Sequence, residues 1–290
     1  MPDTISRFTF DDNPVRGEIV QLEHSYQELL AIHHYPPVVA GLLGELCAAA
    51  SLLAETIKFD GTLTLQVRSE GEIPLIMAEI NDRQQYRAIA RKAGQASSTD
   101  FSTLFHNGQL CLTIQPRNGK PYQGIVSLHG NNLASCLDEY FAQSEQLPTR
   151  IRLAADGERA AGFLLQQMPG AAIPPPQGAP TETAWEHLSH MAATLSSDEL
   201  LTLPREELLY RLYHQEALRL HPEKAVQFQC TCNRQRLEEV LFSLGRDELE
   251  SILEEKGLID VNCEFCNRFY SFSPADIGGL FGEGDDNLRH

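Results

Sequence analysis

The hydrophobic and polar positions of the first 170 residues alternate with a period of two in many places. From residue 61 on, Leu63, Leu65 and Val67 alternate with polar residues, as they do in a strand with one wet face. Asn118-Gly119 and Asp156-Gly157 separate pairs of such segments and favour hairpin turns. The pattern predicts strands at residues 15–22, 62–68, 75–80, 85–91, 109–115, 121–128, 150–155 and 160–167.

Between these strands the hydrophobic period is helical. It predicts helices over residues 24–34, 38–57 and 132–144, where apolar side chains recur three and four positions apart. Pro37 suits a first helical turn, and Asn132 suits a helix N-cap. Residues 1–176 are therefore expected to form one α+β domain, with a largely antiparallel sheet and packed helices.

A proline-rich stretch, residues 170–180, is typical of a domain boundary. Residues 177–222 then predict a linker of two or three short helices with two apolar stripes. Helices this short are marginal in water without docking, so the linker is expected to be metastable. Residues 223–290 are expected to form a small third domain, with a disordered tail after Gly282.

The net charge of the chain limits the kinds of molecule that it is expected to bind. The chain of 290 residues has a formal net charge of −17, and acidic residues exceed basic ones in each of the three predicted parts. Such a protein is not expected to bind nucleic acid or an anionic membrane. The N-terminus shows no secretory pattern, and the apolar stretch of residues 38–54 is short and interrupted by Glu45. We expect a cytoplasmic protein whose thiols are normally reduced.

Four of the seven cysteines form two close pairs near the C-terminus, Cys230-Thr231-Cys232 and Cys263-Glu264-Phe265-Cys266. Two turns that each offer two sulfurs suit one tetrahedral Zn²⁺, with one ion per chain. The alternatives are an iron–sulfur cluster, two permanent disulfides or four scattered core thiols. Cys47, Cys111 and Cys136 look like structural residues, although the sequence does not establish their roles.

The C-x-C pair admits two hypotheses. Closely spaced sulfurs can be oxidised to a strained local disulfide, so the site could hold metal when reduced and lose it when oxidised. A merely structural zinc site is the other reading. In either case a domain as small as residues 223–290 often needs a metal ion or a disulfide to stabilise its fold. Without the metal we expect it to unfold and to expose the apolar stripes of the linker.

The sequence resembles the heat shock protein 33 family over almost the whole chain. The resemblance rests on the two cysteine pairs, on Asn267 and Tyr270, and on three N-terminal segments, residues 122–126, 140–149 and 160–166. One departure is Asn233-Arg234-Gln235-Arg236, where many members have a serine and a glutamate before the final arginine. The departure leaves the four ligands unchanged but could alter how neighbouring groups tune the thiolates.

The resemblance implies an ATP-independent holdase chaperone that is zinc-bound and inactive when reduced. Oxidation would pair Cys230 with Cys232 and Cys263 with Cys266, release the zinc, and unfold the C-terminal region. The active protein, a homodimer, would bind unfolding client proteins under oxidative stress and pass them to ATP-dependent folding chaperones. We expect clients to contact the apolar linker residues Trp185, Leu188, Leu208, Leu209, Leu212 and Tyr213.

Two other functions compete with this one. The chain could be an enzyme, a thiol oxidoreductase that uses Cys263 and Cys266, although Glu264 would tend to raise a thiol pKa there. It could also be an interaction protein whose fold is stabilised constitutively by zinc, with no redox regulation. The holdase is the preferred prediction, and it is not an enzyme.

Overall fold

The computed structural model describes residues 3–57, 59–168 and 183–282. The predicted proline-rich boundary and the predicted C-terminal tail lie largely outside these residues. The chain divides into two compact units, Met1–Gln229 and Cys230–His290. Each unit is described by itself below.

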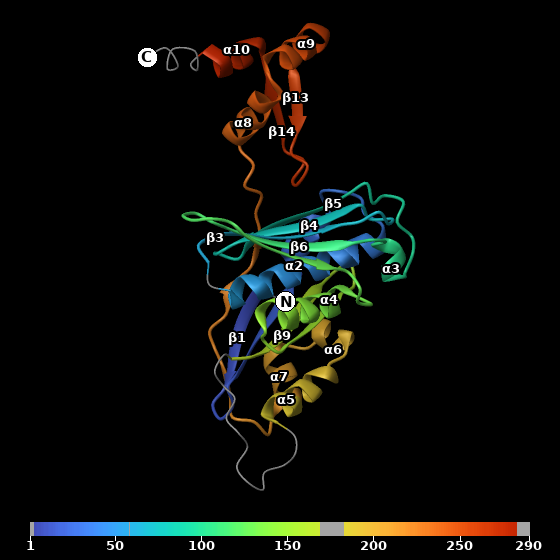
Figure 1. The fold of residues 1–290 in the computed structure, drawn as a ribbon, viewed down its shortest axis with the longest axis vertical. Helices are drawn as coiled ribbons and strands as arrows, with labels where there is room; N and C mark the ends of the chain where they lie inside the picture. The colour runs from blue at the N-terminus through green and yellow to red at the C-terminus, as the bar shows by residue number, and fades with distance from the viewer. Residues whose placement is uncertain (1–2, 58, 169–182, 283–290) are drawn as a thin grey trace. The chain divides into compact units, whose positions relative to one another are not determined.

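The first unit contains two sheets of six strands each (Figure 1). The first sheet has the order β10-β1-β2-β9-β8, and the short strand β11 also pairs with β1. All its pairs are antiparallel. Its strands are β1 (Thr4–Phe10), β2 (Val15–Leu22), β8 (Thr149–Ala155), β9 (Ala160–Gln167), β10 (Leu218–Leu220) and β11 (Lys224–Ala225).

The second sheet has the order β12-β5-β4-β3-β6-β7. Its pairs are antiparallel except that β12 runs parallel to β5. Residues 117–120 connect β6 to β7 and include Gly119 at a φ of +133°, so the predicted hairpin is confirmed. The strands are β3 (Gly61–Arg68), β4 (Leu75–Asn81), β5 (Gln85–Arg91), β6 (Gln109–Pro116), β7 (Tyr122–Ser127) and β12 (Gln227–Phe228).

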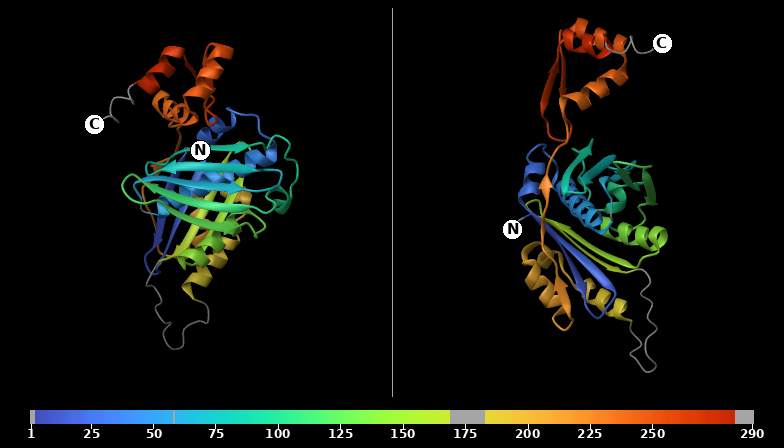
Figure 2. Two further views of the ribbon diagram at one scale, coloured as in Figure 1. Left: turned by 45° about the horizontal axis from the view of Figure 1, so that its top comes forward. Right: turned by 90° about the vertical axis from the view of Figure 1, so that its left-hand side faces the viewer.

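Helix α2 (Pro37–Thr56) lies between the two sheets and packs on strands of both (Figure 2). Its small residues permit this close approach. A Cβ on Gly44 would meet Ala155 and Tyr26 at 2.8 Å. Among the helices described, α2 alone is long and apolar enough to cross a membrane, but 67% of that stretch is buried inside the protein. Core helices of soluble proteins have the same pattern, so α2 carries no argument for a membrane.

The remaining helices of this region are α1 (His24–Leu30), α3 (Phe101–Leu104) and α4 (Leu133–Tyr140). Asn132 caps α4 as predicted, since its side chain accepts a hydrogen bond from the Ser135 N–H at 2.8 Å. The predicted helix of residues 132–144 changes character after Tyr140. Residues Phe141–Glu145 form a π-helix, η1, that ends at Gln146 with a φ of +54°.

Three short helices cover the other face of the first sheet: α5 (Ala184–Ala193), α6 (Ser197–Thr202) and α7 (Arg205–Tyr213) (Figure 2). Successive side chains of β9 point to opposite faces of the first sheet and pack in different cores. Leu164 belongs to the core around α2, whereas Phe163 and Leu165 pack with α5–α7. Because both faces are covered, every residue of β9 from Ala160 to Gln166 is buried.

The second unit consists of α8 (Arg234–Leu244), α9 (Arg246–Lys256), β13 (Ile259–Asn262), β14 (Phe269–Phe272) and α10 (Pro274–Gly282). Strands β13 and β14 form an antiparallel hairpin. Its apolar core is small and is built on five buried residues: Leu241, Leu249, Ile259, Phe272 and Ile277. The predicted α+β class, with antiparallel sheets, packed helices and a small C-terminal cysteine unit, is confirmed.

Candidate metal centre

The four paired cysteines meet in the second unit. Cys230 and Cys232 precede α8, and Cys263 and Cys266 lie in the turn between β13 and β14. Their four sulfur atoms lie within 4.8 Å of one another. Zn–S bonds of about 2.3 Å in a tetrahedron place sulfurs about 3.8 Å apart. The Cys230–Cys263 sulfur distance is 3.7 Å and the Cys232–Cys266 distance is 3.3 Å, so the cluster fits such an ion.

The turn that carries Cys263 and Cys266 is held by its own backbone. The Cys263 N–H donates to the Arg268 carbonyl at 2.9 Å, and the Asn267 N–H donates to the Cys263 carbonyl at 2.7 Å. Asn267 adopts a φ of +56°, a conformation that asparagine tolerates better than most residues. The turn of the β-hairpin therefore fixes the positions of two of the four sulfurs.

The C-x-C turn is fixed by the start of α8. Asn233 caps this helix by accepting a hydrogen bond from the Arg236 N–H at 2.8 Å. The Arg236 guanidinium donates to Thr231 Oγ1, between the two ligand positions, at 3.1 Å. Asparagine and serine are both good N-caps, so the departure at position 233 preserves the local structure.

Arg234 ties the parts of this unit together. Its side chain donates to the Ser271 carbonyl at 2.9 Å and forms an ion pair with Asp276 of α10 at 2.8 Å. The same guanidinium lies 4.4 Å from the centre of the Phe272 ring. One arginine next to the cysteines thus links α8, β14 and α10.

The electrostatic surroundings distinguish the thiols. Burial tends to raise the pKa of Cys232, but hydrogen bonds from Tyr270 and the other cysteines outweigh it and lower the pKa to about 7. Tyr270 Oη lies 3.3 Å from this sulfur. Burial raises the pKa values of Cys230 and Cys266. Cys232 is the thiol that ionises most readily among these three, and an ionised thiol is what a metal binds.

The predicted client-binding residues lie in the first unit, on α5 and α7. They contact the face of the first sheet through residues such as Phe8 and Phe163. The Tyr213 hydroxyl also donates to the Leu188 carbonyl at 3.1 Å, which joins α7 to α5. Trp185 is partly exposed, whereas Leu188, Leu208, Leu209, Leu212 and Tyr213 are buried. In this state of the protein, therefore, most of the apolar stripe is covered.

The other three cysteines lie in the first unit. Cys47 in α2 and Cys136 in α4 are buried, and burial raises the pKa of each thiol. Cys111 in β6 is half-buried and accepts a hydrogen bond from Gln123 at 2.9 Å. Their surroundings are those of structural thiols.

Known proteins similar to this chain share its architecture and its length. The family model described as Hsp33 protein matches residues 3–273. The 33 kDa chaperonin of Pseudomonas paraeruginosa is 48% identical over 295 residues, which cover 99% of each chain. That of Azotobacter vinelandii is 50% identical over 286 residues, covering 97% of this chain and 95% of the relative.

A solved structure of the 33 kDa chaperonin (Hsp33 homolog) from Thermotoga maritima has the same fold. Its TM-score is 0.79 at 21% identity, and the match covers 98% of this chain and 99% of the other. Fold and site together define an α+β protein with a separate four-thiol unit, and the family model and the relatives are those of chaperones. The chain belongs to the Hsp33 family. The predicted resemblance is confirmed.

Proposed function

We propose that the protein is a redox-regulated, ATP-independent holdase. In the reduced form Cys230, Cys232, Cys263 and Cys266 would bind one Zn²⁺, and the chaperone would be inactive. The proposal rests on the four sulfur atoms, which lie within 4.8 Å of one another. One ion bound between them would join two separate turns of the chain. A bound zinc ion would cross-link these turns and stabilise the folded unit.

Oxidation would convert the four thiolates to disulfides, which would no longer bind the zinc ion. We propose disulfides between Cys230 and Cys232 and between Cys263 and Cys266, a pairing that rests on the family resemblance. Each disulfide forms when two thiols lose two protons and two electrons, which reduce one molecule of peroxide to two molecules of water. A disulfide sulfur is a poor metal ligand, since the ligand form is the thiolate.

The apolar core of the second unit is too small to keep the unit folded without a cross-link. Its core contains five buried apolar residues, and large side chains such as Val240, Phe242 and Leu244 are exposed. Structural zinc contributes roughly 10–16 kcal/mol in small metal-binding domains, and much of this is folding free energy. Loss of the centre should therefore unfold residues 230–282.

Unfolding is proposed to spread into the helical linker. Helices α5, α6 and α7 have only 10, 6 and 9 residues, so each depends on docking for its stability. The chain runs from α7 through residues 218–229 directly into Cys230. Undocking of α5–α7 would uncover their apolar stripes and the sheet face beneath, which are the surfaces we propose for clients.

The same resemblance supports the wider functional setting. We propose that the active protein is a homodimer in the cytoplasm, that it acts in the oxidative stress response, and that it passes clients to ATP-dependent folding chaperones. The net charge of −17 favours neither nucleic acid nor an anionic membrane as a partner.

The alternative of a thiol oxidoreductase is less well supported. Such enzymes use a C-x-x-C thiol of low pKa as the nucleophile. Burial raises the pKa of Cys266, and the low value belongs to Cys232 of the other pair. We propose a binding protein and not an enzyme.

The test compares the parent chain with a variant in which Cys230 and Cys232 are both serine, with Cys111→Ser as the matched control. Peroxide and mild heat should release one zinc per chain from the parent and the control, and both should then suppress aggregation of a denatured protein. The double variant should lose this dependence on peroxide. If the oxidised parent releases zinc and still holds no denatured protein, the chaperone mechanism is wrong.

A further inference from the structure

A short segment of the first unit covers the edges of both sheets. This covering segment, residues 218–228, contains β10 and β11, which pair with β1, and β12, which pairs with β5. Its backbone donates from His221 to Arg7 at 2.8 Å and from Gln227 to Gln84 at 3.0 Å. Without this segment, β1 and β5 would be the outermost strands of their sheets.

Apolar and polar side chains both hold the covering segment in place. Val226 is buried in the core around α2, and the Phe228 ring lies 6.2 Å from that of Tyr86. Leu218 and Leu220 pack, partly buried, against the cluster of α5–α7. Both ends of the segment depend on elements proposed to unfold, so we expect it to detach when they do.

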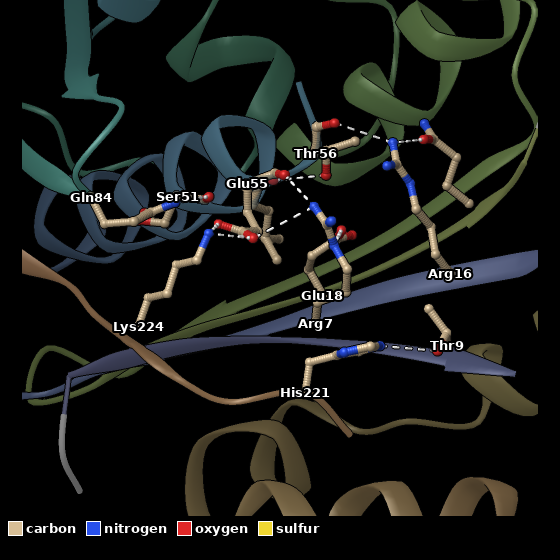
Figure 3. Close-up of polar contacts among 12 residues, drawn as sticks. Arg7, Thr9, Arg16, Glu18, Ser51, Glu55, Thr56, Gln84, His221 and Lys224 are labelled. Carbon is tan, nitrogen blue, oxygen red and sulfur yellow. Dashed lines mark hydrogen bonds and ion pairs between the residues drawn. The ribbon is translucent and has the colours of Figure 1, made fainter. Parts of the chain in front are cut away.

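Polar contacts add to this attachment at the surface (Figure 3). Lys224 Nζ lies 2.9 Å from both carboxylate oxygens of Glu55, and His221 Nε2 lies 3.1 Å from Thr9 Oγ1. The Lys224 side chain is 61% exposed, so its ion pair with Glu55 contributes little to the attachment.

The strands beneath are well fixed. Gln84, at the start of β5, donates its side-chain amide to the Ser51 carbonyl of α2 at 3.2 Å (Figure 3). Arg7 of β1 donates to the Glu55 carbonyl at the end of α2 and to the buried Glu18 carboxylate. The edges should therefore keep their shape when the covering segment leaves.

The covering segment also shows what these edges accept. Two of its three strand contacts follow one pattern, an extended backbone with apolar side chains two residues apart: Leu218-Arg219-Leu220 and Val226-Gln227-Phe228. An exposed strand edge is a ready template for another extended chain. Main-chain hydrogen bonds give affinity with little dependence on sequence, and alternate side chains add selectivity.

We propose that the edges of β1 and β5 bind extended segments of unfolded client proteins by strand addition, and that the covering segment occupies both edges in the reduced protein. The inference rests on the proposed function and specifies a contact surface for it. The occupant is an extended polypeptide with apolar residues at every second position, and the chain's own residues 218–228 are its internal mimic.

Hydrogen exchange of the full chain tests the proposal, with reduced, carboxymethylated α-lactalbumin as a permanently unfolded client. Oxidation should increase exchange in residues 4–10 and 85–91, and the client should restore protection there. Strands β7 and β8, at the opposite sheet edges, should change little with the client. Edges that stay protected after oxidation, or stay exposed while client is bound, would overturn the proposal.

A pair of variants at Thr9 separates edge binding from loosening of the covering segment. The Arg7 carbonyl accepts from His221 of the covering segment, and the Asp11 N–H donates to Ala217 just before it, so the Thr9 N–H also faces the segment. Thr9→Pro removes this donor, and proline is tolerated on an edge strand. Thr9→Val keeps the donor and removes only the contact with His221.

Oxidised Thr9→Pro should bind the client about threefold to tenfold more weakly, the equivalent of one or two backbone hydrogen bonds. Oxidised Thr9→Val should bind like the parent. Equal binding by both variants, with unchanged client protection of residues 4–10, would refute strand addition while leaving the holdase intact. If the oxidised parent holds no client, both proposals fail. Protection that returns without client and rises with protein concentration would place a second copy on the edges, and this too would overturn the inference.

Discussion

At the scale of single residues, Tyr270 is the group that distinguishes Cys232 from the other thiols. Its hydroxyl lies 3.3 Å from the Cys232 sulfur and helps to hold the pKa of this thiol at about 7. Hydrogen bonds from outside the ligand set commonly tune metal sites, and their loss costs about tenfold to a hundredfold in affinity.

Tyr270→Phe should therefore weaken zinc binding by roughly tenfold. Without the hydroxyl the pKa of Cys232 rises, so protons compete better with zinc for the sulfur, and the loss should be larger at pH 6.5 than at pH 8. Chelator competition at the two pH values measures this. Tyr210→Phe, at an exposed tyrosine of α7, is the control. Equal affinities for parent and Tyr270→Phe at both pH values would show that this hydroxyl does not support the ligand.

Glu45 of α2 is a residue whose burial is costly at neutral pH. It lines a polar cavity of about 330 Å³ together with Asp138 and Arg152, and burial raises its pKa to about 7. Between pH 4.5 and 7 the folded state therefore binds more protons at this site than the unfolded state does. Its contribution to stability decreases as the pH rises through this window.

Glu45→Gln should raise the free energy of unfolding of the first unit at pH 8, by on the order of 1–3 kcal/mol. At pH 4.5 and below the difference should vanish, because the parent carboxyl is then protonated in the folded state. Urea unfolding followed by hydrogen exchange in α2, β2 and β9 reports on this unit. The exposed Glu139→Gln is the control. A gain that persists at pH 4.5 would assign the effect to packing instead of charge.

At the scale of elements, α7 has a buried and an exposed side that can be tested separately. Leu212 is 6% exposed within the cluster on the first sheet, whereas Tyr210 is 70% exposed. The marginal helices α5–α7 should therefore respond to one side and not to the other.

Leu212→Ala should destabilise the docked helices by about 2–5 kcal/mol, because it leaves a cavity against the sheet. The reduced, zinc-bound variant should then hold a denatured protein without oxidant. Tyr210→Ala should stay inactive until oxidised. Light-scattering assays of aggregation compare the two. A reduced Leu212→Ala protein with increased exchange in residues 184–213 and no holdase activity would contradict the idea that undocking exposes the client surface.

The sequence predicts regular elements well where the signal is local. The hairpin at Asn118-Gly119 and the cap at Asn132 follow from backbone preferences of those residues, and both are present. The change to a π-helix at Phe141 does not follow, since Ala142-Gln143-Ser144-Glu145 would suit a continued α-helix equally well. Strands β10, β11 and β12 have two or three residues each, and distant partners in β1 and β5 fix them.

The candidate site shows the same limit. The spacing of two cysteine pairs predicts that four sulfurs gather, and the structure brings them together. The contacts of Tyr270 with Cys232 and of Arg236 with Thr231 depend on how α8 and the β13–β14 hairpin fold around the site. Cysteine spacing alone does not predict these two contacts.

At the scale of the whole molecule, the two units differ greatly in their cores. The first unit has a helix packed between two sheets, whereas the apolar core of the second is built on five buried residues. Removal of zinc by a chelator under reducing conditions should therefore unfold residues 230–282 and leave α2, β2 and β9 protected. Hydrogen exchange measures both regions at once. A second unit that keeps its protection after complete zinc removal would show that it does not need the metal.

The central claim is that the folded state of the four-thiol unit controls whether α5–α7 stay docked. The most direct measurement is a peroxide titration at mild heat that follows zinc release, amide exchange in residues 184–213 and client binding in one sample. Zinc release, amide exchange and client binding should all change over the same range of oxidant. A fully oxidised, zinc-free chain whose residues 184–213 remain as protected as in the reduced protein would contradict it.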